Sequence, residues 1–458
     1  MMELDFNDLA AFSEGGKTLR AALEGCAGRV KEAVEKIRRG GSFLGWVDLP
    51  LDERQARGIG AYVTSLPAGI SQAVILGIGG SSLGPRALYS GRYYPSTLLD
   101  GWKPAGGRRL LFLDNADPET VAAVLEGLDP AQTLFAAVTK SGSTAETAAQ
   151  LMIAWEWARA ALGAKAKDHF VFVTDPAKGD LRALAAELAV ASFPVPPDVG
   201  GRFSVFSSVG LLPAAIAGID PLKILAGARA ARDRCLETDL FRNPAAMLGA
   251  AAFLLDTQLR RTVHVFWAYA DRLADAGDWF VQLWGESLGK RRGGGGVGPT
   301  PVAARGATDQ HSLLQLLREG PADKFVIFVD VKKRRHLPVP PLFGSYKAFA
   351  YLGGHGMEEL IACERAGTQR SLAQAGVPTL GISLEEVTEG SMAALMYLLE
   401  VATAVAGFLY EVDPFDQPGV EESKRFAQAL MGRPGLDEVR AALERGAVAG
   451  DPAWRFRV

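Results

Sequence analysis

Two segments of this chain combine glycine and hydroxyl residues in a pattern that suits the binding of an anion. Gly77–Pro85 (GIGGSSLGP) and Thr139–Thr147 (TKSGSTAET) each follow a short apolar run and lead into a helical pattern. Glycine lets the backbone approach a ligand closely, and a helix N-terminus offers unpaired N–H groups and a positive dipole end. Hydroxyl groups at such a position suit a phosphate monoester, whose oxygens accept several hydrogen bonds. The two segments therefore predict a phosphate site.

Each segment also has a less specific interpretation. The first could be a dinucleotide fingerprint, although GIGGSS departs from the Gly-x-Gly-x-x-Gly pattern. The hydroxyls of the second could serve only to cap a helix. Neither segment carries the P-loop motif of nucleotide-binding proteins. Two phosphate-type loops of this kind favour a sugar phosphate as ligand, and the pair resembles the loops of sugar-isomerase domains.

Four further motifs along the chain combine residues that can transfer protons or stabilise charge. They are Gly200–Ser204 (GGRFS), Gln282–Lys290 (QLWGESLGK), Gly306–Ser312 (GATDQHS) and Phe415–Lys424 (FDQPGVEESK). In this order, and together with the two loops, they resemble the motifs of the phosphoglucose isomerase family over about three quarters of the chain. Two departures are small: Thr139 stands where the family usually has serine, and Ala304-Arg305 stands where many members have Trp-Gly.

The resemblance implies an enzyme of glycolysis and gluconeogenesis that interconverts glucose 6-phosphate and fructose 6-phosphate through a cis-enediolate. It assigns the proton shuttle between C2 and C1 to Glu286, because one carboxylate can reach both carbons on the same face. It assigns stabilisation of the enediolate charge to Arg202, and ring opening to His311 and Lys424. In this family the histidine enters from the neighbouring subunit, so a homodimer is expected, with Glu146 orienting that histidine.

The resemblance also implies which residues bind the substrate. They lie in the loops and motifs above: Gly80, Ser81, Thr139, Lys140, Ser141, Thr144, Gln282 and Gln417. The remaining histidines are expected to be structural: His169, His264, His336 and His355. No grouping of His, Cys, Asp or Glu has metal-ligand spacing, and proton transfer of this type needs neither a metal nor another cofactor.

The elements that must position these residues indicate an α/β protein. Strands are expected at Ala73–Gly77, Arg109–Leu113, Thr133–Val138, His169–Val173, Thr262–Ala268, Val302–Ala304, Lys324–Val331 and Thr379–Ile382. Helices are expected at Pro118–Leu128, Ser143–Leu162, Asn243–Arg260, Asp271–Lys290, Asp309–Arg318, Met357–Ala375 and Glu389–Tyr410. This alternation implies right-handed crossovers and parallel sheets.

We therefore expect two sugar-isomerase domains, each a doubly wound, flavodoxin-like and mainly parallel sheet flanked by helices. The first spans residues 46–206 and holds the phosphate loops, and the second spans 207–411 and holds the catalytic Glu and His. A helical N-terminal segment covers 1–45, and a helical C-terminal arm with the catalytic lysine covers 412–458.

Composition limits the partners. A formal net charge of −3 argues against non-specific binding of nucleic acid, which needs a strong positive field. The three cysteines lie far apart without Cys-x-x-Cys pairing, and the MMELD start lacks the basic and apolar regions of a signal peptide. We expect a cytoplasmic protein whose partners are a sugar phosphate and a second copy, with no nucleic acid and no membrane.

Three segments allow two interpretations each. Ser391–Tyr410 is apolar and, at roughly 20 residues, long enough to span a bilayer, but Glu400 lies in its middle and we expect a buried helix. Arg291–Pro299 (RRGGGGVGP) is expected to be a flexible surface connection, the alternative being a loop that closes over the substrate. Lys332–Arg335 (KKRR) follows a strand and is expected to be a solvated turn rather than a targeting signal.

Two other functions fit part of the pattern. A dual phosphoglucose/phosphomannose isomerase would usually be shorter and lack the C-terminal signature. A sugar-phosphate-sensing regulator would keep Ser81 and the 139–144 loop, but it would not need Glu286, His311 and Lys424 together.

Overall fold

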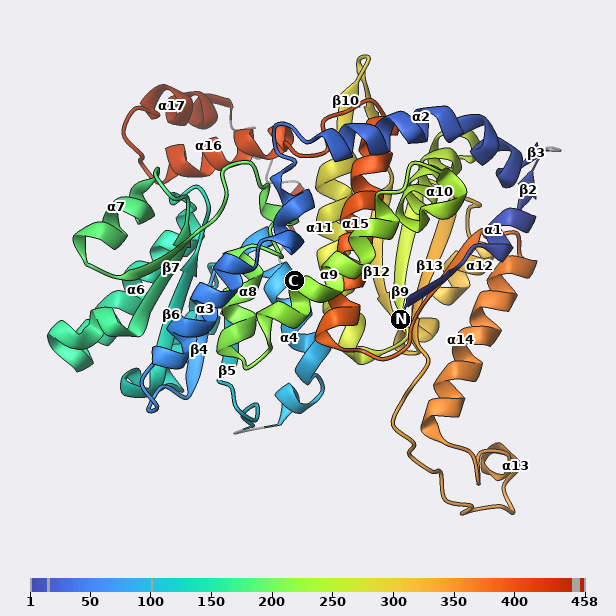
Figure 1. The fold of residues 1–458 in the computed structure, drawn as a ribbon, viewed down its shortest axis with the longest axis horizontal. Helices are drawn as coiled ribbons and strands as arrows, with labels where there is room; N and C mark the ends of the chain where they lie inside the picture. The colour runs from blue at the N-terminus through green and yellow to red at the C-terminus, as the bar shows by residue number, and fades with distance from the viewer. Residues whose placement is uncertain (1, 15–16, 100–101, 447–453, 457–458) are drawn as a thin grey trace. The chain divides into compact units, whose positions relative to one another are not determined.

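The computed structural model describes residues 2–14, 17–99, 102–446 and 454–456, and Figure 1 draws it as a ribbon. The chain divides into two compact units, Met1–Pro414 and Phe415–Val458. The first unit contains two five-stranded sheets that are mostly parallel, with helices packed on them. This confirms the predicted α/β class, whereas the boundaries predicted within the first unit stay predictions.

The first sheet is parallel throughout, with the strand order β5-β4-β6-β7-β8. Its strands are β4 Gln72–Leu76, β5 Arg109–Leu113, β6 Thr133–Val138, β7 Phe170–Thr174 and β8 Ala191–Pro194. All residues of β6 and β7 are buried, as expected for strands covered on both faces. Because β4 lies between β5 and β6, the order of the sheet reverses there, and a topological switch point lies between β4 and β6.

Helices of the same half of the unit pack around this sheet. They are α3 Glu53–Ser65, α4 Leu83–Tyr93, α5 Pro118–Glu126, α6 Ala145–Leu162, α7 Asp180–Glu187 and α8 Ser208–Ile216. Helix α5 begins where its sequence dictates, because Asp117 Oδ1 accepts the Thr120 N–H at 2.9 Å and Pro118 occupies the first turn. Val74, Phe135 and Leu151 belong to the core that joins strands to helices.

The second sheet follows a similar plan, with the order β1-β14-β13-β9-β12. Its parallel strands are β9 Val263–Ala268, β12 Thr300–Arg305, β13 Lys324–Val331 and β14 Thr379–Leu384. Strand β1, Met2–Asp5, pairs antiparallel with β14 at the edge. The N-terminal segment predicted to be helical thus begins with a strand, which was not foreseen because its partner lies near the other end of the chain.

The other helices of the first unit include a long apolar one that was predicted to be buried. These helices are α1 Asn7–Ala11, α2 Leu19–Arg39, α9 Pro221–Cys235, α10 Pro244–Leu259, α11 Ala274–Leu288, α12 Leu314–Glu319, α13 Lys347–Ala350, α14 Met357–Gln374 and α15 Glu389–Leu409. By length and composition α15 could cross a membrane, but 89% of its apolar window is buried inside the protein. A Cβ on Gly249 of α10 would lie 2.4 Å from the Ala402 carbonyl oxygen, so α10 and α15 touch through their backbones.

Glu400 lies in the centre of α15, fully buried, and its two carboxyl oxygens make no hydrogen bond within the described part of the chain. Burial raises its pKa well above the ordinary value of 4.5. In the unfolded chain the group ionises near pH 4.5, so its contribution to stability is fully present below that pH and is lost as pH rises, by at most about 1.4 kcal/mol per pH unit.

Replacing Glu400 with leucine is therefore expected to raise the melting temperature, and to raise it more at pH 8 than at pH 5. Thermal unfolding at the two pH values measures this, with Glu32→Leu on the exposed face of α2 as the control. If Glu400→Leu changed the melting temperature by the same amount at both pH values, this would contradict the conclusion that the buried carboxyl group is neutral.

The glycine-rich segment after α11 is a β-hairpin rather than an irregular connection. Strands β10 Lys290–Arg292 and β11 Gly295–Val297 pair antiparallel around a two-residue turn. The turn residues Gly293 (φ 57°) and Gly294 (φ 86°) have the positive φ values that tight hairpin turns require. The predicted surface position is confirmed, whereas the hairpin was not predicted, because a run of glycines does not by itself indicate strand pairing.

Residues 332–356 form an arm that projects away from the second sheet (Figure 1). A bridge between Pro338 and Gly356 closes its base, and α13 lies near its tip. Six of its large apolar side chains are more than half exposed: Leu337, Leu342, Phe343, Tyr346, Phe349 and Tyr351. The sequence predicted only a solvated turn at the start of this segment.

The second unit is helical in its described part, as predicted for the C-terminal arm. It contains a short turn, Pro418–Val420, followed by α16 Glu421–Leu430 and α17 Asp437–Gly446.

Candidate active site

The hydroxyl-rich segment after β6 forms a cluster whose oxygens face one another. Thr139 Oγ1 lies 2.8 Å from Thr144 Oγ1, and Ser141 Oγ lies 3.4 Å from each of them. Thr144 is the N-cap residue of α6, but its side chain makes no capping hydrogen bond. This argues against the alternative in which the hydroxyls only cap the helix. The cluster is placed to bind an anion at the start of α6.

The glycine loop after β4 lies against this cluster. A Cβ on Gly77 would lie 3.0 Å from the Val138 carbonyl oxygen, at the end of β6. The two loops therefore meet at the carboxyl ends of neighbouring parallel strands, beside the switch point where ligands bind in sheets of this type.

The same glycine loop touches two of the four further motifs, Gly200–Ser204 and Gln282–Lys290. A Cβ on Gly80 would lie 2.3 Å from the Gly201 carbonyl oxygen, which no real contact allows, so only glycine fits beside the turn that carries Arg202. A Cβ on Gly79 (φ 59°) would lie 2.8 Å from Gln282 Nε2 on α11. The loop thus joins the hydroxyl cluster to the Arg202 turn and to α11.

Arg202 and Glu286 form the centre of the site. The Arg202 side chain is only 2% exposed, and its Nη1 donates to Glu286 Oε2 at 3.1 Å. Gln282 Nε2, one turn earlier on α11, lies 3.3 Å from the other carboxylate oxygen, Oε1. The Glu286 side chain is one third exposed. A carboxylate held through both oxygens and open on one side has the geometry of a proton-transfer base.

A buried histidine fixes α11 to the second sheet. Trp284 Nε1 donates to His264 Nδ1 at 3.2 Å, and His264 Nε2 donates to the Arg261 carbonyl oxygen at 3.0 Å. Both ring nitrogens are therefore used by a neutral imidazole. Burial lowers the pKa of His264 from 6.5 to about 3. His264 has the structural role that the sequence predicted.

This burial predicts a specific loss of stability in acid. The unfolded chain binds a proton at His264 below about pH 6.5, whereas the folded chain does not until about pH 3. Stability is therefore lost as pH falls, by about 2 kcal/mol from this group at pH 5. Urea denaturation measures the free energy of unfolding at pH 7 and at pH 5. The difference between the two values should be smaller in His264→Gln than in the natural protein. An equal difference in the free energy of unfolding in both proteins would contradict the conclusion that His264 is buried in its neutral form.

A charge network ties α4 to α11. Arg86 donates to Asp114 Oδ2 at 3.1 Å, to Asp275 Oδ1 at 3.2 Å and to Asp278 Oδ2 at 3.0 Å. Ser82, at the end of the glycine loop, donates to the same oxygen of Asp114 at 3.0 Å. The loop and the helix that carries Glu286 are therefore held by one guanidinium, which no local sequence pattern indicated.

His311 lies on an exposed turn whose neighbours are tied down. Asp309 accepts the Arg305 N–H at 2.7 Å and the Ser312 hydroxyl at 2.8 Å, and Gln310 donates to the Tyr269 hydroxyl at 2.7 Å. The His311 side chain itself makes no hydrogen bond or ion pair with the described residues of its own chain. Within one chain, no hydrogen bond or ion pair of the described residues joins the His311 side chain to Arg202 or Glu286.

Glu146 lies half-buried in the first turn of α6. It lines a cavity of about 440 Å³ between α5 and α6. The rest of the lining is mainly apolar: Ala116, Pro118, Val121, Ala122, Leu125, Ala149, Ile153 and Trp157, with Glu126 and Gln150. No hydrogen bond joins Glu146 to His311 within the described part of one chain.

Lys140, which is predicted to bind the phosphate, directs its ammonium group to the backbone. Its Nζ donates to the carbonyl oxygens of Pro197 at 2.7 Å and Val199 at 2.8 Å, and burial lowers its pKa. Lys140 therefore ties the segment after β6 to the segment that leads into Gly200 and Arg202, and its contact with a phosphate stays a prediction. The sequence could not distinguish this role because it does not give the direction of the ammonium group.

The two predicted residues of the second unit lie on its helical part. Lys424 is on α16 and pairs with Glu421 Oε1 at 2.9 Å, and Gln417 directly precedes the short turn Pro418–Val420. Their catalytic and binding roles stay predictions.

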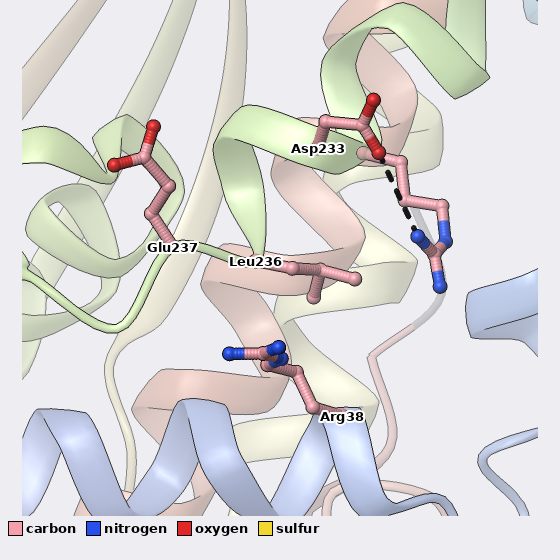
Figure 2. A pocket seen from close by; sticks show the side chains of 5 residues that line it. Arg38, Asp233, Leu236 and Glu237 are labelled. Carbon is pink, nitrogen blue, oxygen red and sulfur yellow. Dashed lines mark ion pairs between the residues drawn. The ribbon is translucent and has the colours of Figure 1, made fainter.

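A charged pocket lies elsewhere, between α2 and the C-terminal end of α9 with the two residues that follow it. Figure 2 shows Arg38 facing Leu236, with Asp233 and Glu237 at the sides. The cavity has a volume of about 430 Å³, and Arg232 completes its lining. None of these residues belongs to the loops or motifs described above.

Comparison with known proteins agrees with the motifs. The family model for phosphoglucose isomerase matches residues 55–444. A glucose-6-phosphate isomerase from Carboxydothermus hydrogenoformans is 40% identical over 452 residues, covering 96% of each chain. Another, from Thermus thermophilus, is 40% identical over 424 residues, covering 92% of this chain and 98% of its own.

Solved structures show the same fold. A hypothetical protein from Thermus thermophilus superposes with a TM-score of 0.84 at 38% identity, covering 94% of this chain and 100% of that one. A glucose-6-phosphate isomerase from Chlamydia trachomatis superposes with a TM-score of 0.81 at 21% identity, covering 97% of this chain and 91% of that one. With its six motifs, its two sheets and these relatives, the chain belongs to the phosphoglucose isomerase family.

Proposed function

We propose that this protein is a glucose-6-phosphate isomerase that interconverts glucose 6-phosphate and fructose 6-phosphate. The observation that carries the proposal is the buried Arg202–Glu286 pair, joined by the glycine loop to a cluster of hydroxyls at a helix start. The names of the relatives support the same substrate and reaction.

In the proposed reaction Glu286 removes the proton from C2 of the open sugar and returns it to C1. The bond between C2 and its hydrogen breaks and a cis-enediolate forms. The hydroxyl proton then moves from the C2 oxygen to the C1 oxygen, and the same carboxylic acid protonates C1, so no other reactant is consumed. Negative charge develops on the sugar oxygens beside Arg202. A fixed cation that is only 2% exposed stabilises such charge more strongly than a solvated one.

The substrate is proposed to be held at two ends. The hydroxyls of Thr139, Ser141 and Thr144, with Ser81, bind the phosphate at the start of α6. Gln282 Oε1 is buried and has no hydrogen-bond partner within the described residues, so it leaves an acceptor for a sugar hydroxyl. His311 and Lys424 move protons between the ring oxygen and the C1 hydroxyl before the proton shuttle begins.

A coupled assay tests the proposal. Purified protein is mixed with fructose 6-phosphate and excess chelator, and glucose 6-phosphate is followed through its dehydrogenase. We expect turnover in the presence of the chelator. No turnover, with sugar phosphate still binding in calorimetry, would favour the sugar-phosphate-sensing regulator instead.

The active unit is further proposed to be a homodimer in which His311 serves the site of the other subunit. Three observations support a protein partner: the exposed His311 side chain, the apolar cavity beside Glu146, and the apolar arm with Phe343 and Tyr346. An exposed apolar patch of this kind favours coverage by protein.

Mixing two inactive variants tests this arrangement. In a mixed dimer of Glu286→Gln and His311→Gln subunits, a shared site would combine both changes in one place and leave the other site intact. We therefore expect activity to return on refolding the two variants together, up to about a quarter of the natural activity from random pairing of the subunits. Continued inactivity of well-folded mixed dimers would mean that each subunit uses its own His311.

A further inference from the structure

Each of the three nitrogens of the Arg202 guanidinium donates to a different acceptor. Nε donates to Ser287 Oγ at 2.7 Å, Nη1 donates to Glu286 Oε2 at 3.1 Å, and Nη2 donates to the Pro414 carbonyl oxygen at 2.6 Å. We propose that Ser287 is a positioning residue that sets the orientation of Arg202 for the isomerisation. The proposal rests on the roles proposed above for Arg202 and Glu286.

Ser287 is suited to this role by its place on α11. It is fully buried and directly follows Glu286 in the last turn of the helix. The base and the acceptor that holds the cation therefore belong to one rigid element, which Trp284 anchors to His264. A shift of the helix moves both together, so the distance between the carboxylate and the guanidinium is kept.

The bond to Nε controls rotation of the guanidinium plane. Nε is the nitrogen that joins the group to the side chain, and the five N–H bonds of the group lie in one plane. With Nε held by Ser287, the directions of the terminal nitrogens beside Glu286 and the Pro414 carbonyl are fixed as well. A cation whose direction is fixed before the reaction stabilises the developing charge without reorganising.

Ser287→Ala removes this acceptor without adding volume. The Nε–H would then be buried with one acceptor fewer, and the guanidinium would turn towards its other partners. The phosphate cluster lies on the loops after β4 and β6 and is not changed. We expect kcat to fall by about 10- to 100-fold, while KM and the dissociation constant for fructose 6-phosphate change by less than about threefold.

The experiment compares the natural protein with Ser287→Ala, Ser287→Thr and a matched control. Ser208→Ala is the control, because Ser208 is also a fully buried serine whose hydroxyl binds one carbonyl oxygen, that of Pro194. The measurements are kcat and KM in the coupled assay, calorimetric binding of fructose 6-phosphate, and the isotope effect on kcat with glucose 6-phosphate deuterated at C2.

We expect a lower kcat and a larger isotope effect in Ser287→Ala but not in Ser208→Ala. In Ser287→Thr, which keeps a hydroxyl, we expect kcat and the isotope effect to return towards their natural values. A kcat of Ser287→Ala within twofold of the natural value would overturn the proposal. So would an equal loss in Ser208→Ala, or a loss confined to KM. Absence of turnover in the natural protein would instead reject the proposed function, which distinguishes the two failures.

Discussion

Replacing Glu286 with glutamine is expected to lower kcat by about 10³-fold or more while fructose 6-phosphate still binds. Glutamine has nearly the same shape, and its amide oxygen can still accept from Arg202 Nη1, which holds the carboxylate at 3.1 Å. Its NH2 group cannot accept from Gln282 Nε2, which lies 3.3 Å from the other carboxylate oxygen, so that contact is kept only if the Gln282 amide turns over. Glutamine cannot accept and return a proton at the sugar carbons. The loss should therefore fall on turnover rather than on binding.

The coupled assay and calorimetry measure the two quantities separately. Glu32→Gln, an exposed glutamate on α2, is the matched control and should keep natural kinetics. If Glu286→Gln retained more than about a tenth of the natural kcat, another group would have to be the base.

Replacing Arg202 is expected to give the second large effect. In Arg202→Met the developing charge on the enediolate has no cation, and kcat should fall by about 10²- to 10³-fold. Arg202→Lys keeps the charge but cannot reach Ser287, Glu286 and the Pro414 carbonyl at once, so an intermediate kcat is expected.

Steady-state kinetics with both variants measure this order, and circular dichroism checks their fold. Arg92, on the exposed side of α4, offers the control Arg92→Met. A kcat for Arg202→Lys equal to the natural one would show that charge alone is sufficient. A kcat for Arg202→Met within tenfold of the natural value would remove Arg202 from the reaction.

Several strands could be predicted well from the sequence. Thr133–Val138 and Lys324–Val331, inside their sheets, have the predicted bounds because strands covered on both faces are continuous apolar runs between turn residues, and the edge strand Arg109–Leu113 also has the predicted bounds. The strand at Met2–Asp5 and the arm at 332–356 were missed. The first is defined by pairing with Thr379–Leu384, and the second exposes its apolar residues, so neither leaves a local signal.

The site could be predicted in its chemistry but not in all its contacts. Motif order identified Arg202 and Glu286, and the structure joins them directly. Lys140 was assigned to the phosphate because it lies among hydroxyls, whereas its ammonium binds Pro197 and Val199. Ser287 was missed because its partner, Arg202, lies in a distant part of the sequence and only the fold brings the two together.

The most direct test of the account is the fate of solvent hydrogen at C2. Fructose 6-phosphate is converted in deuterium oxide by the natural protein and by Glu286→Gln, and glucose 6-phosphate is examined by mass spectrometry and NMR. We predict that the natural protein introduces at most one deuterium atom at C2 per turnover, whenever the carboxyl proton of Glu286 exchanges with solvent before it returns to the sugar, and that Glu286→Gln gives negligible conversion and negligible incorporation. Conversion or incorporation by Glu286→Gln at the natural rate would contradict proton transfer through Glu286.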